Sequence, residues 1–222
     1  GALGSVDNTV IEISGGTVGH YGNDNGNVYG AARGKVDATQ TNIAQVRTTA
    51  VNIKPNSDAS KTANIKGSVF GGGQAGIVQE DVIVNILGGQ IGTTDTNGKV
   101  VGGDVYGGGA LADTQTSSWD ATNKTWATGK SSTTYKTYVN LLGGKILGAA
   151  YGGALGAAGN PAYVYGDTKV NLNGLEAASD IDATTLSSLT GEGKPLVAND
   201  AGYKMKAAST GAIVNRIFGA NN

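Results

Sequence analysis

The sequence predicts an all-β fold, a single-stranded right-handed parallel β-helix with inserted loops, from three observations. A five-residue phrase, consisting of an apolar residue, an aromatic residue and then mainly glycines or alanines, occurs five times in 222 residues. An alternating, strand-like phrase precedes each copy. Glycines number 38, well above the usual share of roughly 7%, and have no collagen period. Such repetition is typical of stacked units, because one unit cannot bury its apolar face alone.

The aromatic phrase has Val-Tyr-Gly-Gly-Gly as its clearest copy, at 105–109. Its five aromatic residues are Tyr29, Phe70, Tyr106, Tyr151 and Phe218. If the units stack, these rings form one column along the stack. Stacked rings that cover neighbouring glycines are ordinary stabilisers of β structure, so we interpret the column as packing. An exposed aromatic stripe that binds sugar rings is the alternative.

The upstream phrase has the form Thr-x-Val-Asn-Ile-x-Gly-Gly-x-Ile. Its copies span 9–18, 49–56, 82–91, 137–146 and 168–175. Apolar residues alternate within it, as Val84 and Ile86 do, which predicts strands. The Gly-Gly pair suits a tight turn with positive φ. One polar position repeats between the alternating apolar residues: Glu12, Asn52, Asn85, Asn140 and Asn171.

That polar row is expected to point outward if the flanking valines and isoleucines point inward. A ladder of stacked amides, or a solvated face, is then the structural interpretation. A row of amides that binds a ligand is the alternative.

The compact copy at 139–154 contains three short strands separated by glycine corners, which describes one turn of a coil. Corresponding strands of successive turns would pair in parallel, about 4.8 Å apart. A β-propeller is the main competitor, but its blades repeat more evenly than the aromatic anchors do. Uneven spacing with an intact motif indicates a coil whose corners accept insertions. Parallel crossovers are overwhelmingly right-handed, so a right-handed coil is expected.

Residues 1–222 are expected to form one β-helix domain that belongs to a longer chain. Insertions are predicted at 35–47, 93–99, 111–136 and 176–212. The last is too long for an ordinary loop, and a short helix is expected near 180–190, with Ser179 or Asp180 as its N-cap. Within 93–99, Asn97-Gly98 predicts a hairpin-type turn.

The third insertion contains both tryptophans of the chain. Residues 119–126 predict a hairpin in which Trp119 and Trp126 face each other. Tyr135 adds a further aromatic side chain nearby. Loops on a rigid scaffold often carry function, so Trp119, Trp126 and Tyr135 are the candidate ligand-binding residues, for a carbohydrate or a partner protein. A Trp pair that only steadies a protruding hairpin is the alternative.

Composition weighs against several classes of function. The net charge is −1 and charged residues make up 15%, unlike the basic footprint of a nucleic-acid binder. The most apolar stretch, 143–159, contains Lys145 and is too short to cross a bilayer comfortably, so no membrane span is expected. His20 is the single histidine and carboxylates are scattered, so no catalytic residues and no enzyme activity are expected.

No metal or cofactor is expected either. The absence of cysteine excludes disulfides and thiolate metal sites. Residues 22–27 offer oxygen ligands suited to Ca²⁺, but the motif occurs only once, and we interpret it as a turn. Residues 92–100 differ from a phosphate-binding loop in spacing, and Val100 replaces the required Ser or Thr.

The alternation of Val-Asn-Ile-x-Gly-Gly-x-Ile with Val-Tyr-Gly-Gly-Gly resembles the glycine-rich repeats of secreted bacterial parallel β-helix proteins, including adhesin-like and autotransporter-passenger-like surface proteins. The resemblance covers most of the chain outside the insertions and carries over no site residues. It implies an extracellular or bacterial cell-surface location and a role in adhesion or surface structure.

The expected function is therefore a non-catalytic, secreted or cell-surface adhesin-like segment that contacts a host or matrix glycan or protein. A carbohydrate-binding or polysaccharide-cleaving β-helix is one alternative, and a phage tailspike-like fibre segment is the second. The sequence leaves the ligand and the oligomeric state open.

Overall fold

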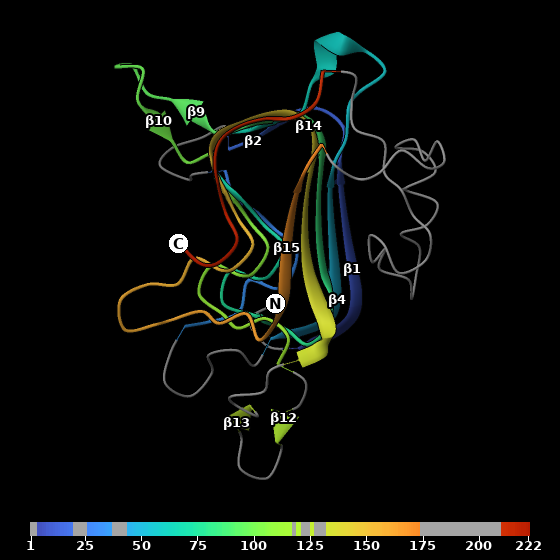
Figure 1. Cartoon of the computed structure of the whole chain (residues 1–222), viewed down its shortest axis with the longest axis vertical. Coiled ribbons are helices and arrows are strands. Elements are labelled where there is room, and N and C mark those ends of the chain that lie inside the picture. The colour runs from blue at the N-terminus through green and yellow to red at the C-terminus, as the bar shows by residue number, and fades with distance from the viewer. Residues whose placement is uncertain are drawn as a thin grey trace.

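The computed structural model describes residues 4–19, 26–36, 44–116, 119–120, 125–126, 132–173 and 210–222. These residues form an all-β structure with one short 3-10 helix, η1 (Ala59–Lys61). Most strands belong to one largely parallel sheet that curls around an apolar interior (Figure 1). Within the part of the chain described, no helix has the length and apolarity needed to span a membrane.

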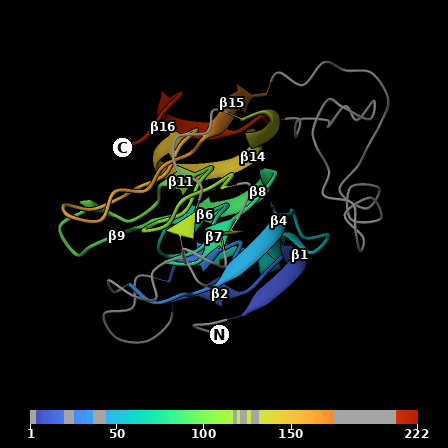
Figure 2. The ribbon, with the colours of Figure 1, turned by 90° about the horizontal axis from the view of Figure 1, so that it is seen from below.

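The predicted upstream phrases form the long strands of this sheet. They are β1 (Ser5–Ile13), β4 (Gln45–Ile53), β8 (Val82–Ile91), β14 (Ser132–Tyr151) and β15 (Gly166–Leu172). Neighbours in this order pair in parallel, and Figure 2 shows them stacked from β1 to β15. The register places Asn85 opposite both Asn52 and Asn140, so equivalent positions of the repeat lie side by side.

The aromatic phrases form a second parallel ladder. It consists of β3 (Val28–Tyr29), β6 (Val69–Phe70), β11 (Val105–Tyr106), the end of β14 and the end of β16 (Ile213–Phe218). A third ladder joins β2 (Thr17–Val18), β5 (Asn64–Ile65), the end of β8, a later part of β14 and the start of β16. In Figure 1 the long strands overlap on the right, and the chain turns back toward them on the left.

The core lies between these ladders. Alternate side chains of the long strands, such as Val84, belong to the same apolar cluster as valines of the aromatic phrases, such as Val105. The fully or nearly fully buried members are Val28, Val51, Ile53, Ala63, Ile65, Val69, Val84, Ile86, Ile91, Val105, Val139, Leu141, Ile146 and Ala150. Burying one such branched side chain stabilises the fold by about 1.5–3 kcal/mol, so the core supplies much of the driving force for stacking.

Glycine follows each aromatic residue, and at every copy but the last the neighbouring repeat unit approaches closely there. A Cβ atom on Gly71 would lie 2.3 Å from the carbonyl oxygen of Gly107, and one on Gly107 would lie 2.3 Å from that of Gly152. Threonine hydroxyls of the long strands bond to the same glycines: Thr49 Oγ1 donates to Gly71 O over 2.7 Å. Close packing between neighbouring repeat units therefore requires glycine at these positions.

The hairpin predicted within 93–99 is confirmed. Strands β9 (Thr93–Thr94) and β10 (Val100–Val101) pair antiparallel. Asp95 Oδ1 accepts hydrogen bonds from the backbone N–H groups of Asn97 and Lys99, over 2.8 and 2.9 Å. Gly98 has φ +78°, which glycine adopts at little cost.

Two strands begin earlier than the predicted insertions allow. Gln45, Val46 and Arg47 belong to β4, since Val46 is buried and pairs with Val6 and with Val78 of β7 (Ile77–Val78). Strand β14 begins at Ser132, inside the predicted insertion 111–136. The helix expected near 180–190 lies outside the described residues, as does most of 176–212.

Candidate functional site

The repeated asparagines form a continuous side-chain ladder. Asn85 Nδ2 donates to Asn52 Oδ1 over 2.8 Å, Asn140 Nδ2 to Asn85 Oδ1 over 2.9 Å, and Asn171 Nδ2 to Asn140 Oδ1 over 2.7 Å. Asn52, Asn85 and Asn140 are fully buried, so the row is not a solvated face. At the first position Glu12 forms an ion pair with Lys54 over 2.6 Å instead. The amides bond to one another, which favours the structural role over ligand binding.

The aromatic column is a stack of rings. Centroids are 5.0, 4.7, 4.8 and 5.0 Å apart from Tyr29 through Phe70, Tyr106 and Tyr151 to Phe218. Phe70, Tyr106 and Tyr151 are buried, and the faces of Tyr106 are covered by its two neighbours. Burial, with the nearby Asp104 carboxylate as the next cause, raises the pKa of Tyr106 well above its usual range. This geometry favours packing over a sugar-binding stripe.

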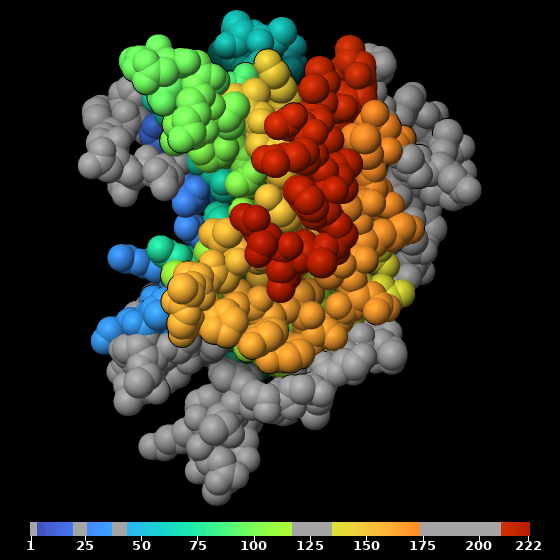
Figure 3. Space-filling model, turned by 60° about the vertical axis from the view of Figure 1, so that its left-hand side comes forward, coloured from blue at the N-terminus to red at the C-terminus, as the bar shows by residue number. Residues whose placement is uncertain are grey.

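The two end rings of the column are more open than the middle three: Tyr29 is half-buried and Phe218 is exposed. Phe218 is 41% exposed, and the C-terminal residues 210–222 lie on the molecular surface, drawn in red in Figure 3.

The two tryptophans occupy opposing positions in the predicted hairpin. Strands β12 (Trp119–Asp120) and β13 (Thr125–Trp126) pair antiparallel, with Trp119 directly opposite Trp126. Figure 1 places this pair below the lower ends of the long strands. The remaining hairpin residues, 121–124, lie outside the described part of the chain.

Tyr135 belongs to a charged corner at the start of the long strands. Its hydroxyl lies 3.5 Å from Glu80 Oε1 and donates to it, and Arg47 Nη1 donates to Glu80 Oε2 over 2.9 Å. Arg47 also binds the carboxylate of Asp7 through two N–H groups. Burial, followed by the charge of Glu80, raises the pKa of Tyr135. Tyr135 is therefore held by the scaffold, which weakens its candidacy as a ligand contact.

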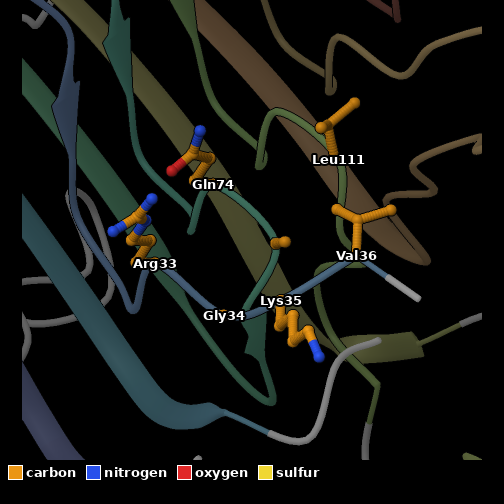
Figure 4. A pocket seen from close by; sticks show the side chains of 7 residues that line it. Arg33, Gly34, Lys35, Val36, Gln74 and Leu111 are labelled. Carbon is orange, nitrogen blue, oxygen red and sulfur yellow. The ribbon is translucent and has the colours of Figure 1, made fainter. Parts of the chain in front are cut away.

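A surface pocket of about 580 Å³ was missed by the sequence analysis. It is lined by Arg33, Gly34, Lys35, Val36, Gln74, Ala75 and Leu111. In Figure 4 the side chains of Arg33 and Gln74 lie together on one side, and those of Val36 and Leu111 lie on the other. We call this feature the Arg33 pocket.

Backbone hydrogen bonds between neighbouring repeat units build its wall. Ala75 N donates to Arg33 O over 2.8 Å, and Leu111 N donates to Gln74 O over 2.7 Å. Gly34 forms a parallel bridge with Ala75 at φ +63°, and a Cβ atom on it would lie 2.3 Å from the carbonyl carbon of Ala75. The residues of the Arg33 pocket thus come together through the coil register, which sequence spacing alone did not indicate.

The Arg33 pocket combines positive charge with an apolar side. Arg33 and Lys35 are both exposed cations, and none of the lining residues that the structure describes is acidic. Gln74 supplies an amide, while Leu111 and the 47% exposed Val36 supply apolar surface. A concave site with an apolar wall and a few convergent polar groups is the usual form of a small-molecule site.

Acidic groups elsewhere serve structural contacts. The half-buried carboxylate of Asp113 accepts hydrogen bonds from Tyr163 N and Tyr165 Oη, over 2.9 and 3.4 Å. Burial raises the pKa of Asp113, and burial together with Asp113 raises the pKa of Tyr165 to about 12. Among the residues that the structure describes, no group of three or more His, Asp or Glu side chains could hold a metal ion. His20 lies outside them.

Comparisons of the chain with protein-family models, with curated proteins and with solved structures found no match. Fold alone does not determine function, so the geometry and chemistry of the side chains have to carry it.

Proposed function

We propose that this chain is a segment of a right-handed, single-stranded parallel β-helix that acts outside the bacterial cell or at its surface as a non-catalytic, adhesin-like scaffold. The continuous asparagine ladder carries the proposal. It joins four long strands in one register and uses their repeated polar side chains in contacts between coils. Units that stack in this way give a stiff body whose stability comes from neighbour contacts.

Insertions at the corners of this body are the proposed contact elements. The β9–β10 hairpin and the β12–β13 pair lie at different corners of the molecule (Figure 1). Val100 and Val101 at the first are each 40% exposed. Trp119 and Trp126 occupy opposite positions at the second, and tryptophan is one of the residue types that dominate binding energy in interfaces. A host or matrix glycan or protein is the proposed partner.

Binding of the purified chain to a glycan array and to immobilised matrix proteins tests this role. The double variant Trp119→Ala/Trp126→Ala is expected to lose at least about tenfold in affinity, the effect of removing interface anchors worth 2 kcal/mol or more. The double variant Val6→Ala/Val10→Ala, at exposed positions of strand β1 outside both hairpins, is the matched control and should bind like wild type. If the wild-type chain binds none of the glycans and none of the matrix proteins, the adhesin-like role is refuted.

Carbohydrate binding is the second candidate function, and the Arg33 pocket favours it. Release of reducing ends from a polysaccharide panel would distinguish a cleaving enzyme from a binding scaffold. The tailspike-like alternative requires an intertwined trimer, so a monomer in light scattering would exclude it.

A further inference from the structure

We infer that the Arg33 pocket binds a carboxylate-bearing sugar unit, such as a hexuronate. The inference deepens the proposed binding function and rests on it, since it names a ligand class and a place on the scaffold. It depends on three properties of the pocket: an uncompensated guanidinium, an apolar wall opposite it, and a rigid backbone frame.

Charge favours an anion here. Arg47 is paired with Asp7 and Glu80, and Lys54 is paired with Glu12. Arg33, in contrast, is exposed and has no ion pair within the described part of the chain, and none of the described residues that line the pocket carries a carboxylate. A guanidinium presents N–H donors in a planar fork that matches a carboxylate in two parallel hydrogen bonds. Lys35 also lines the pocket.

The opposite wall favours a sugar ring over a small inorganic anion. Val36 and Leu111 line the pocket on the other side from Arg33 and Gln74 (Figure 4). A hexuronate has an apolar C–H face, hydroxyl groups and one carboxylate. The C–H face would lie on Val36 and Leu111, the hydroxyls would bond to the amide of Gln74, and the carboxylate would reach Arg33. Sulfate or acetate could use only the last contact.

The backbone around the Arg33 pocket is already ordered without a ligand. Hydrogen bonds Ala75 N to Arg33 O and Leu111 N to Gln74 O connect the lining segments of three coils. A site whose backbone is already ordered loses less entropy on binding. The volume of about 580 Å³ lies within the range of roughly 300–1,000 Å³ that small-molecule pockets occupy.

Titration calorimetry and chemical-shift mapping with D-glucuronate, D-glucose, acetate and sulfate at low salt test the inference. Glucuronate is expected to bind, with D-glucose and acetate each at least about tenfold weaker, since a hydrogen bond to a charged group contributes about 1.5–3 kcal/mol. Arg33→Gln is expected to weaken glucuronate binding about 10- to 100-fold for the same reason. Arg33→Lys keeps the positive charge but lacks the planar fork of N–H donors. Its affinity for glucuronate should therefore lie between those of wild type and Arg33→Gln. Arg216→Gln, on strand β16, is the control and should bind like wild type.

Several outcomes would overturn the inference. Equal affinity for glucuronate and D-glucose would exclude charge recognition, and equal affinity for glucuronate and acetate or sulfate would reduce the pocket to a simple anion site. Unchanged glucuronate affinity in Arg33→Gln, with a wild-type circular dichroism spectrum, would place binding elsewhere. If adhesion is lost in Trp119→Ala/Trp126→Ala while Arg33→Gln has no effect on any sugar, this inference fails and the proposed function stands. If the wild-type chain binds glucuronate but none of the array glycans or matrix proteins, the proposed function fails instead.

Discussion

Asn140 donates a hydrogen bond from its side-chain Nδ2 to Oδ1 of Asn85 over 2.9 Å, and both side chains are fully buried. Asn85 in turn donates to Asn52, so an internal amide of the ladder gives one bond and receives one. A slip of one residue between strands would turn every amide to the opposite face. Because an unsatisfied buried polar group costs about 1–3 kcal/mol, the ladder fixes the register of the coils.

Asn85→Ala is expected to lower the free energy of unfolding by about 2–4 kcal/mol, because it leaves Asn52 Oδ1 and Asn140 Nδ2 without their ladder partners. Urea unfolding followed by circular dichroism measures the change. Asn171→Ala is the matched control at the end of the ladder, where one bond is broken and the side chain is half-buried. Equal losses in the two variants would contradict a cooperative ladder.

Repetition made the strands, their parallel pairing and both side-chain columns predictable. Positions that are equivalent in the repeat, such as Asn52 and Asn85, become neighbours once the coils stack. Burial of the asparagine row was less predictable, because strand alternation identifies the face on which a side chain lies and not what covers that face. The start of β4 at Gln45 was missed because only contact with β7 and β1 buries Val46.

The Arg33 pocket could not be predicted from spacing. Arg33, Gln74 and Leu111 belong to three different units of the repeat, and no local motif connects them. Their proximity depends on the bridge between Gly34 and Ala75 and on the hydrogen bond from Leu111 N to Gln74 O. The signal available in the sequence was the pair of basic residues, Arg33 and Lys35, on either side of Gly34.

Gly107→Ala is expected to destabilise the fold by about 1–3 kcal/mol or more, the usual cost of overpacking. The added Cβ atom would lie 2.3 Å from Gly152 O and 2.3 Å from Thr137 Cγ2. Gly219→Ala is the matched control, since Gly219 is the last glycine of the same column and a Cβ atom there meets nothing within 4 Å. Thermal unfolding of both variants decides: a fall in Tm in Gly219→Ala as large as that in Gly107→Ala would exclude contact between coils as the reason for glycine.

Tyr106→Ala is expected to cost about 3–5 kcal/mol, because removing a buried aromatic ring leaves a cavity. Its ring lies between Phe70 and Tyr151, and its hydroxyl lies near Asp104 Oδ2 and Asn222 Nδ2, at 3.3 and 3.1 Å. Phe218→Ala, at the open end of the column, is expected to cost about 1–2 kcal/mol, since the ring is partly exposed. Tyr106→Phe keeps the stack and should lose about 1 kcal/mol. A greater loss in Phe218→Ala than in Tyr106→Ala would refute the column as a stabilising element.

Asp113→Asn is expected to remove a pH-dependent part of the stability. Burial raises the folded-state pKa of Asp113 above its value in the unfolded chain, and the hydrogen bonds from Tyr163 and Tyr165 oppose this only in part. The native state therefore takes up the proton first as the pH falls, so this group destabilises the fold above its folded-state pKa and the penalty disappears below its unfolded-state pKa.

The variant cannot take up that proton, so the stability of wild type relative to Asp113→Asn should rise as the pH is lowered from about 7 to about 3, across the ordinary range of carboxyl pKa values. Urea unfolding of both proteins at each pH measures the difference and cancels the titration of the other carboxyl groups. Asp95→Asn, in the exposed β9–β10 turn, serves as the comparison for an acidic residue outside this site. A constant difference between wild type and Asp113→Asn would show that the hydrogen bonds from Tyr163 and Tyr165 balance burial at this carboxylate, and a difference that falls with falling pH would show that they outweigh it.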